Sequence, residues 1–221
     1  MYEVNAEIAQ KVIDAVRPGL VKGMGEPIPG QMCVEAAVCF AYGLPHSDEP
    51  PCVGRYVRSL KIHLNDSKWS SNKSRAKGML RLSVAQLGSD QIDHQEEFNK
   101  IVQKMVIQKF LPLILRHVGL NKEADRCEAE GTVASAYAAA NAAYNAAYNA
   151  AYYAAREAAY NAYANAARDD VHAAGYDVHA AAINHIASEL GEHILHNFAE
   201  EVVQILIQMK SPGCEYLYLT E

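Results

Sequence analysis

The sequence predicts an all-α protein, with short helices in its N-terminal half and a long alanine-rich helix in its C-terminal half. Residues 122–210 contain no proline and are rich in alanine, the residue with the highest helix propensity. In the N-terminal half, apolar residues recur at spacings of three and four between stretches rich in proline and glycine. An alternating pattern typical of a β-strand is found only in the short tail 215–219.

The N-terminal half is expected to form a series of helices separated by loops. Apolar positions at helical spacing predict a helix over 3–16, which Pro18 and Gly19 end. A loop over 20–30 leads to a helix over 31–42, which is apolar nearly all round and is therefore expected to be central. Further helices are predicted over 53–64, 71–87, 93–118 and 121–130.

Individual residues mark where these helices begin, bend and end. Ser71 or its neighbour Ser70 can cap the helix that runs to residue 87, because a serine hydroxyl accepts a hydrogen bond from a free backbone N–H. Gly88 follows the end of that helix. Pro112 is expected to kink the helix that contains it, and Gly131 to end the charged helix before it.

Residues 134–167 form an alanine-rich rod in which the tetrad Ala-Ala-Tyr-Asn recurs. A repeat of four exceeds the 3.6 residues of a helical turn, so a tyrosine stripe and an alanine stripe drift around opposite sides of the helix. The alanine stripe would let another helix approach closely. A helix over 132–168 would be ~55 Å long, whereas a compact chain of this length has a radius of gyration of ~17 Å. We therefore expect a helical hairpin or a dimer.

The tyrosine and asparagine face of the rod has three interpretations. It can simply keep an alanine-rich helix soluble. It can bind a partner, because tyrosine supplies rigid amphipathic area and is enriched at interfaces. It can bind ice, although alanine-rich antifreeze helices usually carry regularly spaced threonine. The residues predicted to bind a partner are Tyr144, Asn145, Tyr148, Asn149 and Tyr152.

A second long helix is predicted near the C-terminus and is the candidate partner of the rod. Its apolar stripe, at spacings of three and four, consists of Ile183, Ile186, Leu190, Ile194, Phe198, Val202, Ile205 and Met209. The opposite face carries side chains of types that bind metals: His185, Glu189, His193, His196 and Glu200. Because metal sites in helical bundles lie in the core, we expect this face to be solvated and predict no metal or cofactor. A surface metal ion and a pH-sensitive contact are the alternatives.

The five cysteines are odd in number and include no C-x-x-C pair, which indicates neither a disulfide framework nor a zinc ribbon. Reduced thiols are typical of the cytoplasm, where we expect the protein. The N-terminus lacks the pattern of a secretory signal, and no apolar run reaches the length of a membrane span.

Cys33 is a candidate nucleophile, because a thiolate is favoured at the N-terminus of a helix. The pattern from Cys33 through Ala36 to Gly43 resembles the nucleophile helix of papain-like bacteriocin-processing peptidases. The resemblance implies a cysteine hydrolase. That family also carries a small sheet with histidine and aspartate, which has no counterpart among the predicted elements, so we favour a packed, inert thiol.

The segment 55–81 is strongly basic. It holds eight basic residues and one acid, whereas the rest of the chain holds 12 basic and 25 acidic residues. A helix that starts near Ser71 would offer backbone N–H groups to a phosphate. The residues predicted to bind phosphate or nucleic acid are Arg55, Arg58, Lys61, Lys68, Trp69, Lys73, Arg75 and Lys77. An acidic protein partner and a solvated face are the alternatives.

Two stretches, PGQMCVEAAVCFAYGLPHSDEPPCVGRYVRSLKIHLND and KSPGCEYLYL, resemble a group of uncharacterised bacterial or phage-encoded proteins. The resemblance implies no activity. We predict a non-enzymatic, homo-oligomeric interaction protein, most simply a dimer, with a helical globule over 1–120 and a long-helix region over 121–221. It would dock a protein through the rod or the basic segment. Binding of nucleic acid or nucleotide phosphate through the basic segment is the alternative, and cysteine hydrolysis a minor one.

Overall fold

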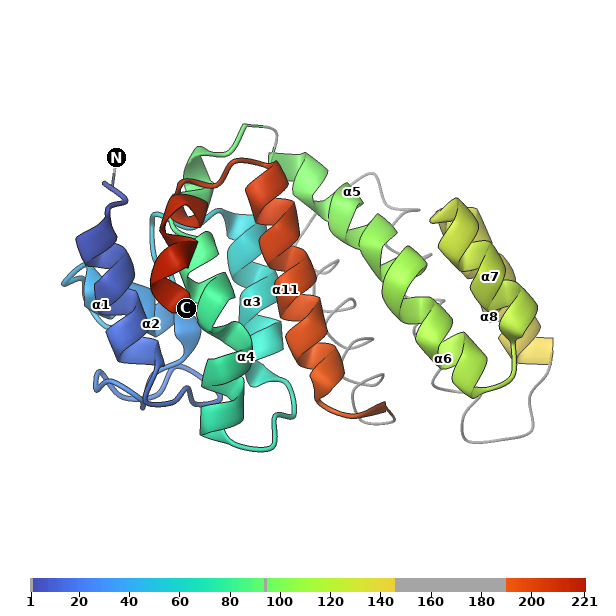
Figure 1. Ribbon diagram of the computed structural model, residues 1–221, viewed down its shortest axis with the longest axis horizontal. Coiled ribbons are helices and arrows are strands. Elements are labelled where there is room, and N and C mark those ends of the chain that lie inside the picture. Colours follow the sequence, from blue (N-terminus) through green and yellow to red (C-terminus); the bar gives the residue numbers. More distant parts are fainter. Residues whose placement is uncertain (1, 94, 146–189) are drawn as a thin grey trace. The chain divides into compact units, whose positions relative to one another are not determined.

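The structure, a computed structural model, describes residues 2–93, 95–145 and 190–221 (Figure 1). These residues confirm the all-α prediction, since they form helices and no strand beyond one isolated bridge between Gly25 and Met32. Among them, no helix is both long enough and apolar enough to cross a membrane. The chain divides into two compact units, of residues 1–98 with 195–221 and of residues 99–194.

The described helices follow the predicted order closely. They are α1 (Ala6–Val16), α2 (Val34–Ala41), α3 (Arg55–Asp66), α4 (Asn72–Ala85), the 3₁₀-helix η1 (Ser89–Gln91), α5 (Gln95–Met105), the π-helix η2 (Val106–Phe110), α6 (Leu111–His117), α7 (Asn121–Glu130), α8 (Val133–Asn145), α11 (His193–Gln208) and the 3₁₀-helix η3 (Pro212–Thr220).

In the first unit, α4 packs against α1, α2 and η3, and α1 also packs against α2 and η3 (Figure 1). All of α2 except Phe40 is buried, which confirms that this apolar helix is central. The Trp69 ring can pack directly on α4 only because residue 78 is glycine. A Cβ atom at that position would overlap the ring. Small residues on α4 thus let its neighbours pack tightly.

The predicted helix ends agree with the structure at several positions. Ser71 caps α4, with its Oγ accepting a hydrogen bond from the backbone N–H of Ser74 at 3.0 Å. Gly88 and Gly131 adopt left-handed φ angles of 74° and 59° after α4 and α7, as expected for residues that end helices.

The helix around Pro112 is disturbed as the sequence predicts. Proline has no N–H to donate to the carbonyl four residues earlier. Just before it, the N–H of Leu111 donates to the carbonyl of Val106, five residues back, which closes a π-type turn. The π-helix η2 is therefore the local adjustment between α5 and α6.

The alternating pattern in the tail 215–219 does not form a strand, since these residues are part of the 3₁₀-helix η3. The tail docks on the end of α4. The backbone N–H of Gly213 donates to the carbonyl of Leu87 at 2.7 Å, and the Ser211 hydroxyl donates to the carbonyl of Ala85 at 2.7 Å. A strand needs a partner strand for its backbone groups, and the helix end supplies the hydrogen bonds here.

The first unit draws on two separate stretches of the sequence, while the predicted boundary near residue 120 stays a prediction. From Leu195 onward, α11 and η3 belong to the first unit, so this unit combines both ends of the sequence. Within the predicted helix over 183–209, α11 begins at His193, two residues after Gly191, whose φ is 100°. Phe198, Val202 and Ile205 are buried, which confirms that part of the apolar stripe. Residues 146–189 lie outside the described part.

In the second unit, α7 packs against both α6 and α8. The face of α8 formed by Ala136, Ala139, Ala140 and Ala143 is buried. The long alanine-rich helix and its alanine stripe stay predictions, because most of the repeat lies beyond residue 145. Tyr137 is exposed. The side chains of Tyr144 and Asn145, and the whole of Tyr148, Asn149 and Tyr152, lie outside the part that the structure describes.

Candidate functional site

The predicted phosphate-binding residues do not share one surface, because three of them are part of the interior. Trp69 is one of these. Its side chain is 8% exposed, its ring covers Gly78, and its Nε1 donates to the backbone carbonyl of Leu64 at 2.9 Å. The indole therefore joins α3 to α4 and is not available to stack on a base.

Lys61 is fully buried, with its Nζ 3.0 Å from Oε1 of the fully buried Glu35. Within the described part of the chain, no hydrogen bond of normal geometry reaches either carboxylate oxygen or the ammonium. Burial raises the pKa of Glu35 and lowers the pKa of Lys61, and in each case the charge of the partner acts in the opposite sense. Lys61 is thus a core residue that cannot reach a polyanion.

Arg75 is 6% exposed and holds three segments together. Its guanidinium donates to the backbone carbonyls of Asn65 and Leu20 at 2.7 Å and 2.8 Å, and to Oδ1 of Asn72 at 2.8 Å. These bonds join the end of α3, the segment after α1 and the start of α4. Arg75 is therefore a positioning residue for that region and not a surface contact.

Arg55 and Arg58 lie in the first turn of α3, at the end of that helix remote from Lys68. A helix of 12 residues spans about 18 Å, so they are separated from the start of α4. The Arg55 guanidinium lies 4.5 Å from the centre of the Tyr56 ring, and Arg58 pairs with Glu49 at 3.3 Å. Both arginines have local partners.

The remaining predicted residues are exposed: Lys68 in the α3–α4 loop, and Lys73 and Lys77 in the first two turns of α4. Two further exposed cations, Arg17 and Lys22, join them from the segment after α1. Figure 1 shows the start of α4, the α3–α4 loop and this segment at the same end of the first unit. We call these five residues the basic edge.

Two hydrogen bonds hold the parts of the basic edge together. The Lys73 ammonium donates to the backbone carbonyl of Arg17 at 3.1 Å, and the N–H of Leu20 donates to the carbonyl of Asn72 at 3.0 Å. Sequence reasoning missed Arg17 and Lys22 because they lie some 50 residues away along the chain. No local sequence pattern predicts that the segment after α1 lies beside the start of α4.

An acid lies beside the basic edge. Asp66, at the end of α3, is half-buried, and its Oδ1 accepts hydrogen bonds from the backbone N–H of Gly23 at 2.8 Å and from Nδ2 of Asn65 at 2.9 Å. These bonds fix the loop that carries Lys22. The carboxylate of Asp66 therefore has a structural role.

Cys33 lies at the N-terminal cap of α2, as the sequence predicts, but its surroundings do not favour a nucleophile. It is 5% exposed, and its Sγ accepts a hydrogen bond from the N–H of Ala36 at 3.3 Å. Burial raises the pKa of the Cys33 thiol to about 11. At neutral pH this sulfur is a thiol and not the reactive thiolate.

A small pocket adjoins Cys33. It is lined by Gly23, Met24, Cys33, Val34, Glu35, Asp48, Ile62, Asn65 and Asp66. Its volume of about 30 Å³ gives room for one or two water molecules and not for an organic substrate. The geometry around Cys33 therefore gives no support to hydrolysis.

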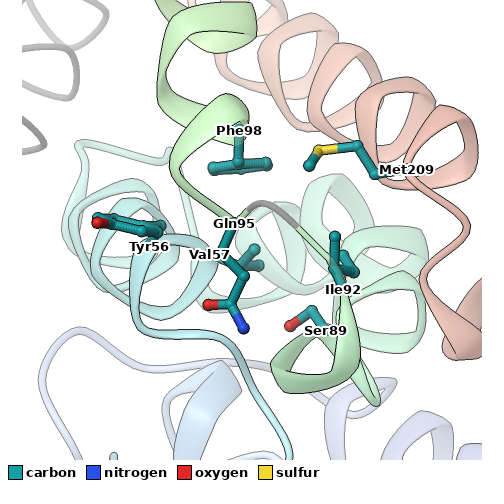
Figure 2. A pocket seen from close by; sticks show the side chains of 7 residues that line it. All are labelled: Tyr56, Val57, Ser89, Ile92, Gln95, Phe98 and Met209. Atoms are coloured by element: carbon teal, nitrogen blue, oxygen red, sulfur yellow. The ribbon is translucent and has the colours of Figure 1, made fainter.

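A second pocket in the first unit is smaller and mostly apolar (Figure 2). Phe98 and Met209 lie along one side of it, while Ser89 and Gln95 contribute polar groups. The Ser89 hydroxyl accepts the N–H of Gly54 at 2.9 Å, and Gln95 donates to the carbonyl of Asp90 at 2.8 Å. With about 10 Å³ of space, this pocket is a packing defect and not a ligand site.

The described residues contain no group of three or more histidine, cysteine, aspartate or glutamate side chains arranged to hold a metal ion. His193 and His196 are exposed, and Glu200 pairs with Arg81 at 3.0 Å. His185 and Glu189 lie outside the described part. The structure therefore describes only the C-terminal half of the predicted metal-competent face.

Comparison of the chain with protein-family models, with curated proteins and with solved structures finds no match. The resemblance to uncharacterised bacterial or phage-encoded proteins stays a prediction. The basic edge is accordingly argued from its residues and their geometry.

Proposed function

We propose that the first unit is a non-enzymatic binding module that docks a polyanionic macromolecule through the basic edge. The observation that supports this proposal is the gathering of five exposed cations from three segments at one end of the unit. The two pockets described above are too small for a substrate, so docking fits the described geometry better than catalysis.

The distribution of charge supports the same proposal. The chain has a net charge of −6, yet this end of the first unit exposes lysine and arginine. Such a local patch attracts a polyanion even when the whole protein is acidic, because the interaction is screened beyond about 8–10 Å at physiological salt. The interior bonds of Arg75 hold the three segments in place before binding, which reduces the entropy lost on docking.

Chromatography on immobilised heparin, a linear polyanion, tests this proposal. The variant Lys73→Glu with Lys77→Glu reverses two charges one turn apart on α4 and should elute at clearly lower salt than the wild-type chain. The matched control is Lys100→Glu with Lys104→Glu, which reverses two exposed lysines with the same spacing on α5. Both variants have the same net charge. Equal elution of the two variants would contradict the proposal.

A second candidate is the tyrosine and asparagine face of the alanine-rich rod, which would dock a protein partner. The support for it is α8, in which the alanine face is buried while Tyr137 is 43% exposed. The variant Tyr148→Ala with Tyr152→Ala should then retain fewer partners in an affinity capture from the host and should melt at an unchanged temperature. Unfolding of that variant would show that these rings belong to a core.

A further inference from the structure

We infer that the basic edge binds the phosphate backbone of double-stranded nucleic acid without reading the base sequence. This inference rests on the proposed function and names the partner of the same surface. The inference depends on two observations: which side chains are exposed at the edge, and which nearby side chains are buried.

The side chains near the edge that are best suited to read bases are buried or already hydrogen-bonded. Direct readout relies on arginine, asparagine and glutamine, which form paired hydrogen bonds with base edges. Arg75 is buried, and Asn72 has its Oδ1 occupied by the Arg75 guanidinium. Four of the five cations of the edge are lysines, which act as point charges on phosphate and not as bidentate readers.

A platform for single-stranded bases is also missing from the edge. Proteins that bind single strands stack successive bases on exposed aromatic side chains. Trp69, the aromatic residue nearest to the edge along the chain, is buried against Gly78, and its N–H is bonded to Leu64. Without stacking, a single strand would gain only electrostatic attraction, and the higher charge density of a duplex is then favoured.

The start of α4 suits phosphate in a further way. The first N–H groups of a helix have no acceptors within that helix, and the helix dipole adds positive potential there. Lys73 and Lys77 are one turn apart, about 5–6 Å, on this 14-residue helix. A phosphate group would therefore meet both lysine charge and the positive end of α4.

An acidic protein partner fits these observations less well. Lysine is depleted at protein–protein interfaces, whose cores are enriched in aromatic residues and arginine. The edge consists of four lysines and one arginine, and Trp69 beside it is buried. Lysine contacts to phosphate, in contrast, supply most of the non-specific affinity for nucleic acid.

Binding of the full chain to labelled DNA in a salt series tests the inference. The probes are two duplexes of equal length and unrelated sequence, one single strand of that length, and polyglutamate. The two duplexes should bind within about threefold of each other and more tightly than the single strand. The plot of log K against log salt should have a slope no steeper than about −4.5, since five cations release at most five counterions.

The variant Lys73→Gln should weaken binding to both duplexes equally and make the salt slope shallower by about 1. The control Lys100→Gln should change neither, and its thermal melt should match the wild type. Lys73→Gln should melt only slightly lower, since it loses one exposed hydrogen bond to the Arg17 carbonyl. An affinity difference above tenfold between the duplexes, a preference for the single strand, or an unchanged slope in Lys73→Gln would overturn the inference. Binding to polyglutamate but not to DNA would overturn it and leave the proposed function standing. Binding to none of the probes at low salt would overturn both.

Discussion

At the scale of single residues, Glu35 and Lys61 carry opposite charges where neither side chain touches solvent. Removing two charges from water costs several kcal/mol for each ion, and their attraction offsets that cost only with good geometry. Here the Nζ–Oε1 distance is 3.0 Å, but no hydrogen bond of normal geometry is formed. The pair is therefore expected to couple its two residues strongly while adding little net stability.

A double-mutant cycle on this pair gives the first prediction. Lys61→Met alone should lower the free energy of unfolding by about 3–5 kcal/mol, because Glu35 is left as a buried, unpaired carboxylate. Adding Glu35→Leu should recover most of that loss, since two apolar side chains need no partner. Urea unfolding measures each free energy. The exposed pair Glu7–Lys11 is the control and should show little coupling. Additive effects at Glu35 and Lys61 would contradict the prediction.

The five cysteines give a second prediction, because burial raises the pKa of each of their thiols to about 11. The folded chain at pH 8 then holds about 0.1% of each thiol as thiolate. Between pH 8 and pH 10 the thiolate fraction should rise about 90-fold in the folded chain, against about 10-fold in urea, where the pKa returns toward 9.0.

Alkylation by iodoacetamide, followed by mass spectrometry of each cysteine, measures these rates. All five positions should react slowly at pH 8 in the native protein and quickly in urea. Rapid native alkylation of Cys33 at pH 8 would show an activated thiolate. That result would return the cysteine-hydrolase hypothesis to consideration.

At the scale of secondary-structure elements, α4 is both the packing centre of the first unit and the support of the basic edge. Its start is held by the Ser71 cap and by the bonds from Arg75 to neighbouring segments. The sequence predicts the cap, because serine before a helical pattern has a local meaning. It does not predict that Arg75 points inward, since that depends on where Leu20 and Asn65 lie in the fold.

The Ser71 cap gives the third prediction. Ser71→Ala should lower the free energy of unfolding by about 1 kcal/mol, because the N–H of Ser74 loses its acceptor. Ser71→Thr keeps a hydroxyl and should cost less. Thermal and urea unfolding of both variants measure the difference. Equal losses in the two variants would contradict a capping role for the hydroxyl at this exposed position.

At the scale of the whole molecule, the two ends of the chain meet in one unit. The Tyr216 hydroxyl donates to the carbonyl of Val4 at 3.2 Å, and Ser211 and Gly213 bond to the end of α4. The first unit combines residues 1–98 with the last 27 residues, 195–221. No local sequence pattern predicts this pairing, because it depends on contacts between segments far apart in the chain.

Removal of the tail gives the fourth prediction. A chain that ends at Lys210 loses the hydrogen bonds of Ser211 and Gly213 and the burial of Leu217. The first unit should then be less stable by on the order of 4 kcal/mol. Differential scanning calorimetry measures the shift, and removal of Glu221 alone is the control. An unchanged melting temperature in the shorter chain would contradict the packing described here.

The sequence by itself determined the all-α class and most ends of the described helices. These depend on helix propensity, caps and periodicity, which act over a few residues. Tertiary structure decided which charged residues face solvent. Lys61 and Arg75 are buried, whereas Arg17 and Lys22 join the lysines of α4. Burial depends on contacts between segments far apart in the chain, so a run of basic residues does not reveal which of them form a surface.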